Sequence, residues 1–259
     1  MKIATWNVNS LRVRLPQLEA WLAATQPDVL CLQETKVRDS DFPATAFSAL
    51  GYQVVFHGQP SYNGVAIAAR GALTDVEVGF EGFADEQCRC LSASYQGLRV
   101  ASLYVPNGTA LESPRYPYKL EWLRALRAQT VRWLSQYPAL VLAGDFNIAP
   151  EDRDVYDPKA WEGSVLVSEP ERAAFREVLA LGFTDALRTL GGDKGNFTWW
   201  DYRAYAFRRD QGLRIDHILL SDSLRPACCA CSVDREARAD ARPSDHAPVV
   251  AEIAWPATP

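Results

Sequence analysis

Short apolar runs that end in polar or acidic residues recur along the whole chain. They are KIATWNVN, DVLCLQET, GVAIAAR, RVASLYVPNG, ALVLAGDFN, RIDHILLS and APVVAEIAW. Their lengths and β-branched content predict strands. Longer segments with helical spacing lie between them: Leu11 to Ala24, about Ser113 to Tyr137, and EPERAAFREVLALG, which stops at Gly182. Strands and helices mixed over the full length predict an α/β or α+β sandwich.

No linker, low-complexity tract or charge block marks a boundary, so residues 1–259 are expected to form a single domain. One short polar motif occurs twice. The first strand ends in Asn7-Val8-Asn9, and a strand in the middle of the chain ends in Asp145-Phe146-Asn147. This match is weak evidence for a duplicated core with two sheets.

Composition narrows the class of protein. The chain is 48% hydrophobic and 23% charged, as in a soluble globular protein. No apolar run is long enough to span a membrane, and the N-terminus lacks the apolar segment of a signal peptide, so we expect a cytoplasmic protein with no membrane partner. The net charge of −5 would repel a polyanion, so any nucleic-acid site must be local. The six cysteines contain no C-x-x-C pair, which disfavours a zinc finger and favours reduced, packed thiols.

Polar side chains follow the ends of the predicted strands, where they can converge on one rim of a sheet. They are Asn7, Asn9, Glu34, Tyr104, Asn107, Asp145, Asn147 and Asp216, with Asp245 and His246 just before the last strand. Neither a serine in a G-x-S-x-G turn nor a cysteine beside a base accompanies them. Singly, such residues are more often turn or helix caps, but caps are not required at so many strand ends.

An oxygen-rich cluster of this kind suits a hard cation, Mg²⁺ or alternatively Mn²⁺. A phosphodiester is then the natural substrate. Its hydrolysis needs a positioned water, a group that orients or deprotonates that water, and donors or positive charge around the phosphorus. Asp145 could serve the water, Glu34 the metal, and the Asn, Tyr and His side chains the phosphate.

The sequence resembles a known family over nearly its full length. The motifs that carry the resemblance are TWNVNSLR, LQETK, YNGVAI, YVPNG, GDFNIAP, TWWDYR, GLRIDHIL and SDHAP, in this order. They are similar to those of the exonuclease III family of DNA repair nucleases, in the endonuclease/exonuclease/phosphatase superfamily with the deoxyribonuclease I-like fold. The resemblance implies a four-layer α/β sandwich, in which two mixed sheets pack face to face with helices outside, and a monomer.

The resemblance also implies roles for the polar residues. Glu34 would ligate the metal with Asn9 and Asp245 close to it, and Asp145 and Asn147 would lie at the same site. Asp145 would activate or align the attacking water, and Asn147 and Asn7 would orient it and the phosphate. The phosphate would be contacted by Tyr104 and Asn107, and by His246, whose tautomer Asp216 would fix. An imidazole paired with a buried carboxylate holds its charge more readily and presents its other nitrogen as a donor.

A DNA-facing edge is implied at TWWDYR and GLRID. Trp199, Leu213 and Ile215 match an apolar pocket that receives a flipped-out abasic sugar. Of the adjacent Trp199 and Trp200, one is expected in the core, because neighbouring strand residues face opposite ways. Arg203 would reach into the DNA beside the lesion. The basic residues of 202–214 and 114–132, among them Lys119, would follow the phosphate backbone.

The expected function is therefore a metal-dependent DNA repair phosphodiesterase acting on double-stranded DNA with abasic sites or with blocked or recessed 3′ ends. It would cut 5′ to an abasic site to leave a 3′ hydroxyl, and act as a 3′ to 5′ exonuclease and 3′ phosphatase. The ranking of these activities and the number of metal ions stay open. One alternative is a non-catalytic nucleic-acid-binding regulator, which should lack some of the acidic residues that are present here. Another is hydrolysis of lipid or inositol phosphates, which the TWWDYR and GLRID motifs disfavour.

Overall fold

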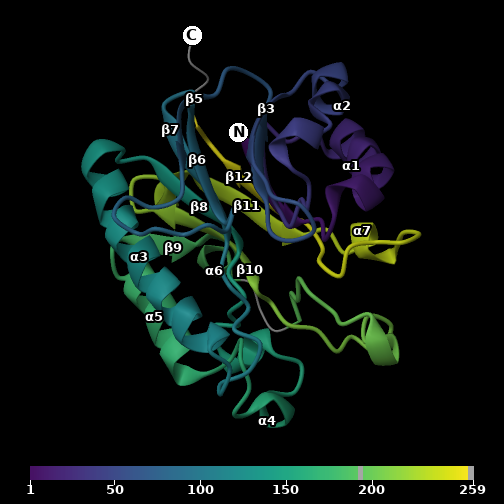
Figure 1. The fold of residues 1–259 in the computed structure, drawn as a ribbon, viewed down its shortest axis with the longest axis vertical. Coiled ribbons are helices and arrows are strands. Elements are labelled where there is room, and N and C mark those ends of the chain that lie inside the picture. The colour runs from purple at the N-terminus through teal and green to yellow at the C-terminus, as the bar shows by residue number, and fades with distance from the viewer. Residues whose placement is uncertain (192–194, 256–259) are drawn as a thin grey trace.

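Two six-stranded β-sheets pack face to face, and helices cover their outer faces. The structure is a computed structural model that describes residues 1–191 and 195–255. Figure 1 shows α1 and α2 on the outside of one sheet and α3 and α5 on the outside of the other. This arrangement confirms the predicted four-layer sandwich with two mixed sheets. None of the helices in the described ranges is long and apolar enough to cross a membrane.

The first sheet has the strand order β11-β12-β1-β2-β4-β3. Its strands are β1 (Lys2–Asn7), β2 (Val29–Gln33), β3 (Gln53–His57), β4 (Val65–Ala69), β11 (Cys228–Val233) and β12 (Val249–Ile253). The helices of this half are α1 (Leu11–Thr25), α2 (Ala44–Ala49) and α7 (Glu236–Ala239).

The second sheet has the strand order β5-β6-β7-β8-β10-β9. Its strands are β5 (Thr74–Val78), β6 (Cys90–Tyr95), β7 (Leu98–Tyr104), β8 (Leu140–Asp145), β9 (Phe183–Asp185) and β10 (Asp216–Ser221). Its helices are α3 (Arg115–Gln136), α4 (Pro158–Trp161), α5 (Glu169–Leu179) and α6 (Ala186–Thr189). A capping box between Ser168 and Glu171 starts α5, satisfying backbone donors that the first helical turn leaves free.

The two sheets are built alike around their central strands. β1 pairs in parallel with β2 and antiparallel with β12. β8 likewise pairs in parallel with β7 and antiparallel with β10. The Asn7-Val8-Asn9 and Asp145-Phe146-Asn147 segments therefore leave equivalent strands of the two sheets.

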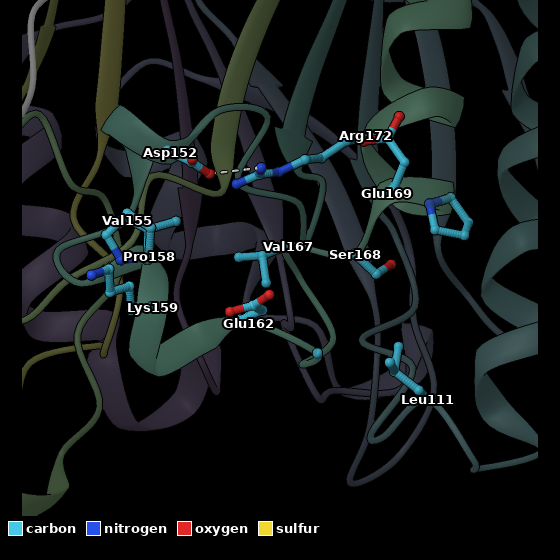
Figure 2. A pocket seen from close by; sticks show the side chains of 12 residues that line it. Leu111, Asp152, Val155, Pro158, Lys159, Glu162, Val167, Ser168, Glu169 and Arg172 are labelled. Atoms are coloured by element: carbon cyan, nitrogen blue, oxygen red, sulfur yellow. Dashed lines mark hydrogen bonds and ion pairs between the residues drawn. The ribbon is translucent and has the colours of Figure 1, made fainter.

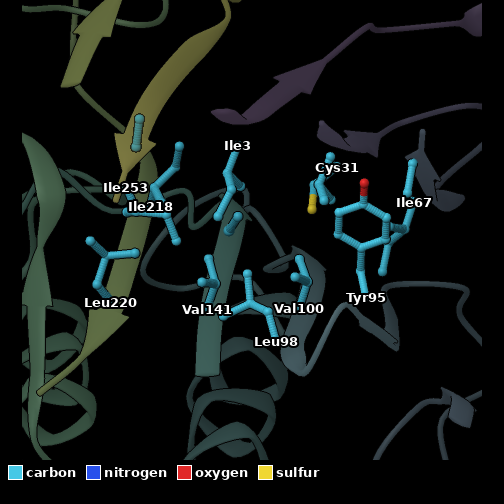
Figure 3. Close-up of a cluster of buried hydrophobic side chains, with 14 of the residues drawn as sticks. Ile3, Cys31, Ile67, Tyr95, Leu98, Val100, Val141, Ile218, Leu220 and Ile253 are labelled. Carbon is cyan, nitrogen blue, oxygen red and sulfur yellow. The ribbon is translucent and has the colours of Figure 1, made fainter. Parts of the chain in front are cut away.

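The main core lies between the sheets. Ile3 and Ile67 of the first sheet pack against Val100, Val141 and Ile218 of the second, and all five are fully or almost fully buried (Figure 3). Because each inner strand is also covered by helices on its outer side, strands such as β2 and β8 are buried on both faces. That explains why they read as continuous apolar runs instead of an alternating pattern.

The cysteines are free thiols, as expected. Cys31, Cys88 and Cys90 are buried. Cys229 is exposed on the edge strand β11, so the expectation of packed thiols fails for this residue.

Candidate active site

Strand polarity brings the polar strand ends together. The parallel pairs β1–β2 and β7–β8 each end at one rim, and the antiparallel strand β10 begins there. In register, Asp145 lies between Tyr104 and Asp216 in the second sheet. Across the sandwich, Asn7 ends β1 and Glu34 follows β2. The rim thus gathers side chains from both sheets over a rigid core.

The backbone at this rim turns sharply. Asn9, Glu34 and Asn147 all have positive φ, of 41°, 50° and 49°. Asparagine tolerates this left-handed region, but for a glutamate it is strained and costs about 1–3 kcal/mol. Hydrogen bonds hold the turn in place, since the Glu34 carbonyl accepts from Ser10 N (2.8 Å) and Thr35 N donates to Gly64 O (3.1 Å). Strained backbone of this kind clusters at active sites.

Asn7 joins the two halves of the site. Its buried side-chain amide donates to Glu34 Oε1 at 2.8 Å and to Asp145 Oδ2 at 2.9 Å. One ligand atom each of Glu34, Asp145 and His246 lie within 4.8 Å of one another. The residues that the sequence placed at separate strand ends therefore share one small volume.

The oxygens around Glu34 fit a hard cation. Glu34 Oε2 and Asn9 Oδ1 both contact the ammonium of Lys36, at 2.8 and 2.6 Å. The amide of Asn9 donates to Asp245 Oδ1 at 2.9 Å, which links the second carboxylate to the same cluster. Carboxylate and amide oxygens already gathered around a positive charge are the donor set that Mg²⁺ or Mn²⁺ prefers. Lys36 lies within the LQETK motif but is not among the residues predicted for the site.

Asp145 lies at the centre of the site in an unusual electrostatic state. Burial raises its pKa to about 7, against the opposing effect of the neighbouring His246. Asn147 holds both its oxygens, donating from its backbone N to Oδ1 (2.8 Å) and from its side chain to Oδ2 (3.2 Å). A fixed carboxylate with a pKa near neutrality can accept a proton from water at physiological pH.

His246 pairs with Asp216 and also lies beside Asp145. Its Nδ1 lies 2.8 Å from Asp216 Oδ2, and its Nε2 lies 3.8 Å from Asp145 Oδ2. Burial alone would lower the pKa of His246, but the charges of Asp216 and Asp145 outweigh burial and raise it to about 10. The imidazolium is therefore the resting form, and Nε2 is a proton donor directed into the site.

Tyr104 and Asn107 lie on one wall of the site. Burial and the charge of Glu34 raise the pKa of Tyr104 well above 10, so its hydroxyl stays protonated. The Asn107 amide donates to Asn147 Oδ1 at 3.0 Å. Both residues line a cleft of about 470 Å³ that Glu34, Lys36, Arg89 and Arg115 also border. This cleft carries three cationic side chains beside a single carboxylate, an arrangement suited to an anionic ligand.

Lys119 does not face DNA, and this prediction is wrong. Its side chain is fully buried and ion-paired with Glu171 at the start of α5. It also donates to the carbonyls of Asn147 (2.7 Å) and Asn107 (3.2 Å). The sequence pattern could not reveal the buried partner, because Glu171 is 52 residues away. Lys119 instead ties two site-bearing loops to the protein interior.

The apolar pocket expected at Trp199, Leu213 and Ile215 is also corrected. Leu213 and Ile215 are 0% and 1% exposed and pack with Val155 and Leu166. The segment that follows β8 runs beside them, because Val155 forms a β-bridge with Leu213. Only Trp199 keeps partial exposure, and its indole donates to Asp245 Oδ2 at 3.0 Å. Trp200 is fully buried, so one tryptophan of the pair is in the core, as predicted.

Arg203 is exposed, with 87% of its side chain accessible, and it pairs with Asp201. Arg214 was counted in the same basic cluster, but it is buried and bound to Asp154 and Asp185. The positive charge of this segment is therefore carried by Arg203, Arg208 and Arg209.

A larger hollow lies elsewhere. About 600 Å³ in volume, it is bordered by the 152–169 segment and the start of α5 (Figure 2). Arg172 spans one side of it to Asp152 at 2.8 Å. None of the residues predicted for catalysis or metal binding lines it. Of the predicted site residues, Glu34, Tyr104 and Asn107 line the smaller cleft.

The fold and the rim are typical of a hydrolase of phosphate esters, with an oxygen-rich cluster, a buried carboxylate whose pKa is near neutrality and an imidazole paired with a second carboxylate. The endonuclease/exonuclease/phosphatase family model matches residues 4–246. Exodeoxyribonuclease III of Haemophilus influenzae is 34% identical over 98% of this chain and 100% of its own length. The DNA repair nuclease APEX1 of Danio rerio is 32% identical over 98% of this chain and 82% of its own.

Solved structures agree. A 3′ phosphatase, NExo, from Neisseria bound to a product DNA hairpin superposes with a TM-score of 0.97 at 47% identity, covering 98% of this chain and all of its own. An AP endonuclease from Archaeoglobus fulgidus gives a TM-score of 0.96 at 39% identity, with the same coverage. The chain belongs to the exonuclease III family within the endonuclease/exonuclease/phosphatase family. This result confirms the family and the enzyme class predicted from the sequence.

Proposed function

We propose that this protein is a metal-dependent DNA repair phosphodiesterase that hydrolyses phosphate esters at DNA 3′ ends and the linkage 5′ to abasic sites. One observation carries the proposal: Glu34, Asp145 and His246 arrive from separate strands and meet within 4.8 Å. A cation ligand, a proton acceptor and a proton donor are the minimum set for hydrolysing a phosphate ester by attack of water.

Asp145 takes the proton of the attacking water. Its pKa of about 7 leaves a substantial part of it ionised at neutral pH, and Asn7 and Asn147 keep the carboxylate from rotating. The water must attack phosphorus in line with the leaving oxygen. A fixed carboxylate that holds the water in this orientation lowers the entropic part of the activation barrier.

His246 and Tyr104 stabilise the negative charge that grows on the phosphate oxygens. The imidazolium donates from Nε2, and Asp216 keeps the other nitrogen protonated. The neutral phenol of Tyr104 and the amide of Asn107 act from the cleft wall. Preorganised donors at the site of developing charge contribute about 3–4 kcal/mol each when they are removed singly.

We propose Mg²⁺ as the physiological metal, with Mn²⁺ as a substitute, held by Glu34 with Asn9 and Asp245 beside it and Asp145 and Asn147 at the edge of the site. Such an ion would polarise the phosphate and neutralise its charge. Lys36 contacts both Glu34 and Asn9, so it would have to withdraw or share these oxygens when the ion binds.

Two observations favour 3′ ends as the principal substrate. The side chains expected to line an abasic-sugar pocket, Leu213 and Ile215, are buried in one apolar cluster with Val155 and Leu166. A relative that is 47% identical along nearly all of this chain is a 3′ phosphatase. Entry of an abasic sugar beside Leu213 and Ile215 would require this cluster to open, whereas a terminal phosphate needs no such pocket.

The test is cleavage of matched duplexes that carry a 3′ phosphate, a recessed 3′ end or an abasic analogue, each with Mg²⁺ and with a chelator. We expect cleavage only with the metal, and fastest removal of the 3′ phosphate. Asp145→Asn should abolish it, while Asp152→Asn, a change at an exposed carboxylate outside the site, should not. Cleavage in the chelator, or none of any duplex, would contradict the proposal. Abasic cleavage as fast as phosphate removal would contradict the ranking alone.

The non-catalytic regulator is disfavoured because the acidic residues, Asn7 and His246 form one connected cluster of hydrogen bonds and ion pairs. Lys36 joins Glu34 to Asn9, and His246 joins Asp216 to Asp145. We further propose that the protein acts as a monomer with a single domain, which sedimentation of the free protein and of its DNA complex would test.

A further inference from the structure

One surface loop beside the active site has a strained backbone and an exposed aromatic tip. It covers residues 201–211, and we name it the Tyr205 loop. Figure 1 shows it standing out from the body of the molecule in the green part of the chain before β10. The mechanism above uses none of its residues.

Both ends of the Tyr205 loop are fixed at the active site. Trp199, just before it, forms β-bridges with Leu213 and with His246. The backbone of Trp200 donates to Asp245 O at 3.0 Å. Tyr202 donates to Pro243 O at 2.8 Å. The loop therefore rises directly from the residues that surround the candidate metal and phosphate site.

The middle of the loop is anchored in the protein. Phe207 packs edge-on against the buried Trp200, with ring centroids 5.0 Å apart. Arg235 and Arg238 lie over the Phe207 ring, at 5.8 and 5.1 Å from its centroid. Backbone hydrogen bonds inside the loop include Gln211 N to Ala206 O at 2.9 Å. The tip is thus presented by a packed base and is not a free chain.

The tip itself is held in a conformation that its residues disfavour. Ala204 and Tyr205 have φ of 55° and 54°, in the left-handed region that glycine occupies without penalty. Two consecutive residues of this kind lower stability, and such strain is maintained where function requires it. The effect of the strain is to direct a tyrosine outward: Tyr205 is 73% exposed, the highest value among the large apolar side chains of the described chain.

The surroundings of Tyr205 are cationic. Arg208 lies with its guanidinium 5.8 Å from the centre of the Tyr205 ring. Arg209 is exposed on the same loop, as is Arg203, which pairs with Asp201. The Tyr205 hydroxyl has no hydrogen-bond partner within residues 1–191 and 195–255. A free aromatic face flanked by arginines is the combination that binds nucleic acid, since phosphates contact the cations while a base stacks on the ring.

We propose that Tyr205 is a DNA-binding residue whose ring stacks on the exposed face of a base at the DNA end that the active site processes. The proposal rests on the proposed function and adds a residue that recognises the substrate by stacking. Stacking on the ring does not involve the hydroxyl and depends little on salt concentration. Contacts of Arg203 and Arg208 with phosphate, in contrast, are weakened by salt.

Binding of a duplex with a recessed 3′ end, measured by fluorescence anisotropy in a chelator, tests this contact. Tyr205→Ala should weaken binding roughly 5- to 100-fold without changing the slope of log Kd against log salt. Tyr205→Phe should bind within about twofold of the wild type. Arg208→Ala should instead reduce the salt slope by about one. Val131→Ala, a change at an exposed apolar residue on α3, is the control and should have no effect.

Glycine variants separate binding from stability. Ala204→Gly relieves strain and keeps the ring, so it should raise Tm by about 2–4 °C and leave DNA affinity unchanged. Tyr205→Gly should raise Tm similarly and weaken DNA binding as much as Tyr205→Ala. With 2-aminopurine as the terminal 3′ base, the wild type and Tyr205→Phe should change its fluorescence, and Tyr205→Ala should not.

The inference is overturned if Tyr205→Ala binds and signals like the wild type while the wild type still cleaves DNA. It is equally overturned if Tyr205→Ala changes only the salt slope. Failure of the proposed function is a separate result, since the wild type itself would then cleave no duplex.

Discussion

Replacing Asp216 with asparagine removes the negative charge 2.8 Å from His246 Nδ1 and keeps the shape of the side chain. In the wild type, Asp216 and Asp145 overcome the effect of burial and raise the pKa of His246 from 6.5 to about 10. Loss of one buried opposite charge lowers the pKa of a neighbour by about 1–3. The Asp216→Asn variant should therefore lose the imidazolium at a lower pH.

The direction of the change in rate with pH follows from which protonation state of His246 is active. His246 acts as the charged donor, so the rate falls as pH rises through its pKa. If that pKa drops by about 2, the charged fraction at pH 9 falls by about tenfold, whereas at pH 7 it falls only slightly. Asp216 also raises the pKa of Asp145, so the acid limb of the profile, governed by ionisation of Asp145 near 7, should move slightly to lower pH.

The raised pKa of His246 also contributes to the folding stability of the protein. Because the folded pKa of His246 lies above the unfolded value, its stabilising contribution is complete below about pH 6.5 and disappears as pH rises through about 10. For the variant this contribution should shrink by about 1.4–4 kcal/mol at low pH, at 1.36 kcal/mol for each pKa unit.

The assay is single-turnover cleavage of a duplex with a 3′ phosphate, at saturating protein, from pH 6 to pH 10. Saturating protein removes any effect on DNA binding, so the rate constant reports the chemical step. Asp152→Asn serves as the control for a lost carboxylate. Rate constants equal to those of the wild type at every pH would refute the role of Asp216.

Three further predictions concern other parts of the molecule. Glu34→Gln should weaken Mg²⁺ binding at least tenfold in a calorimetric titration, and an unchanged affinity would remove Glu34 from the metal site. Lys119→Met should lower the free energy of unfolding, measured in urea, by about 3–5 kcal/mol, because it leaves Glu171 buried without its partner. Adding Glu171→Leu should restore part of this stability. If Lys119→Met alone is as stable as the wild type, the internal role of Lys119 is contradicted. A thiol reagent should modify the exposed Cys229 first, because Cys31 is buried with a raised pKa, so Cys229→Ser should remove the fastest phase, and its persistence would show that another cysteine is accessible.

The inner strands could be predicted from the sequence because burial on both faces leaves an unbroken apolar run, as in VLCLQ of β2 and LVLAGD of β8. Most of the strands that were missed, β3, β5, β9 and β11, lie at sheet edges. The exception is β6, a buried inner strand whose sequence CLSASY has two serines that interrupt its apolar run. β5 at one edge reads TDVEV and is mostly exposed, and β9 at another has only three residues. Edge strands have little buried surface, so their sequences carry little apolar pattern.

The rim of the active site was predictable for a similar reason. Polar residues directly after buried strands must emerge near one another when the strands are parallel neighbours. Lys119 and Leu213 were misplaced because their environments depend on distant segments: Glu171 lies far along the chain, and Val155 pairs with Leu213 from another loop. Counting local charge likewise placed Arg214 at the surface, although Asp154 and Asp185 neutralise it inside the protein.

The most direct test of the account is a crystal structure with Mn²⁺ and an oligonucleotide ending in a 3′ phosphate, using Asp145→Asn to prevent turnover. The account predicts an anomalous peak at about 2.0–2.4 Å from a Glu34 carboxylate oxygen and a phosphate oxygen within hydrogen-bond distance of His246 Nε2. A metal peak away from Glu34, or a phosphate that His246 does not contact, would show that these side chains do not act on one scissile group.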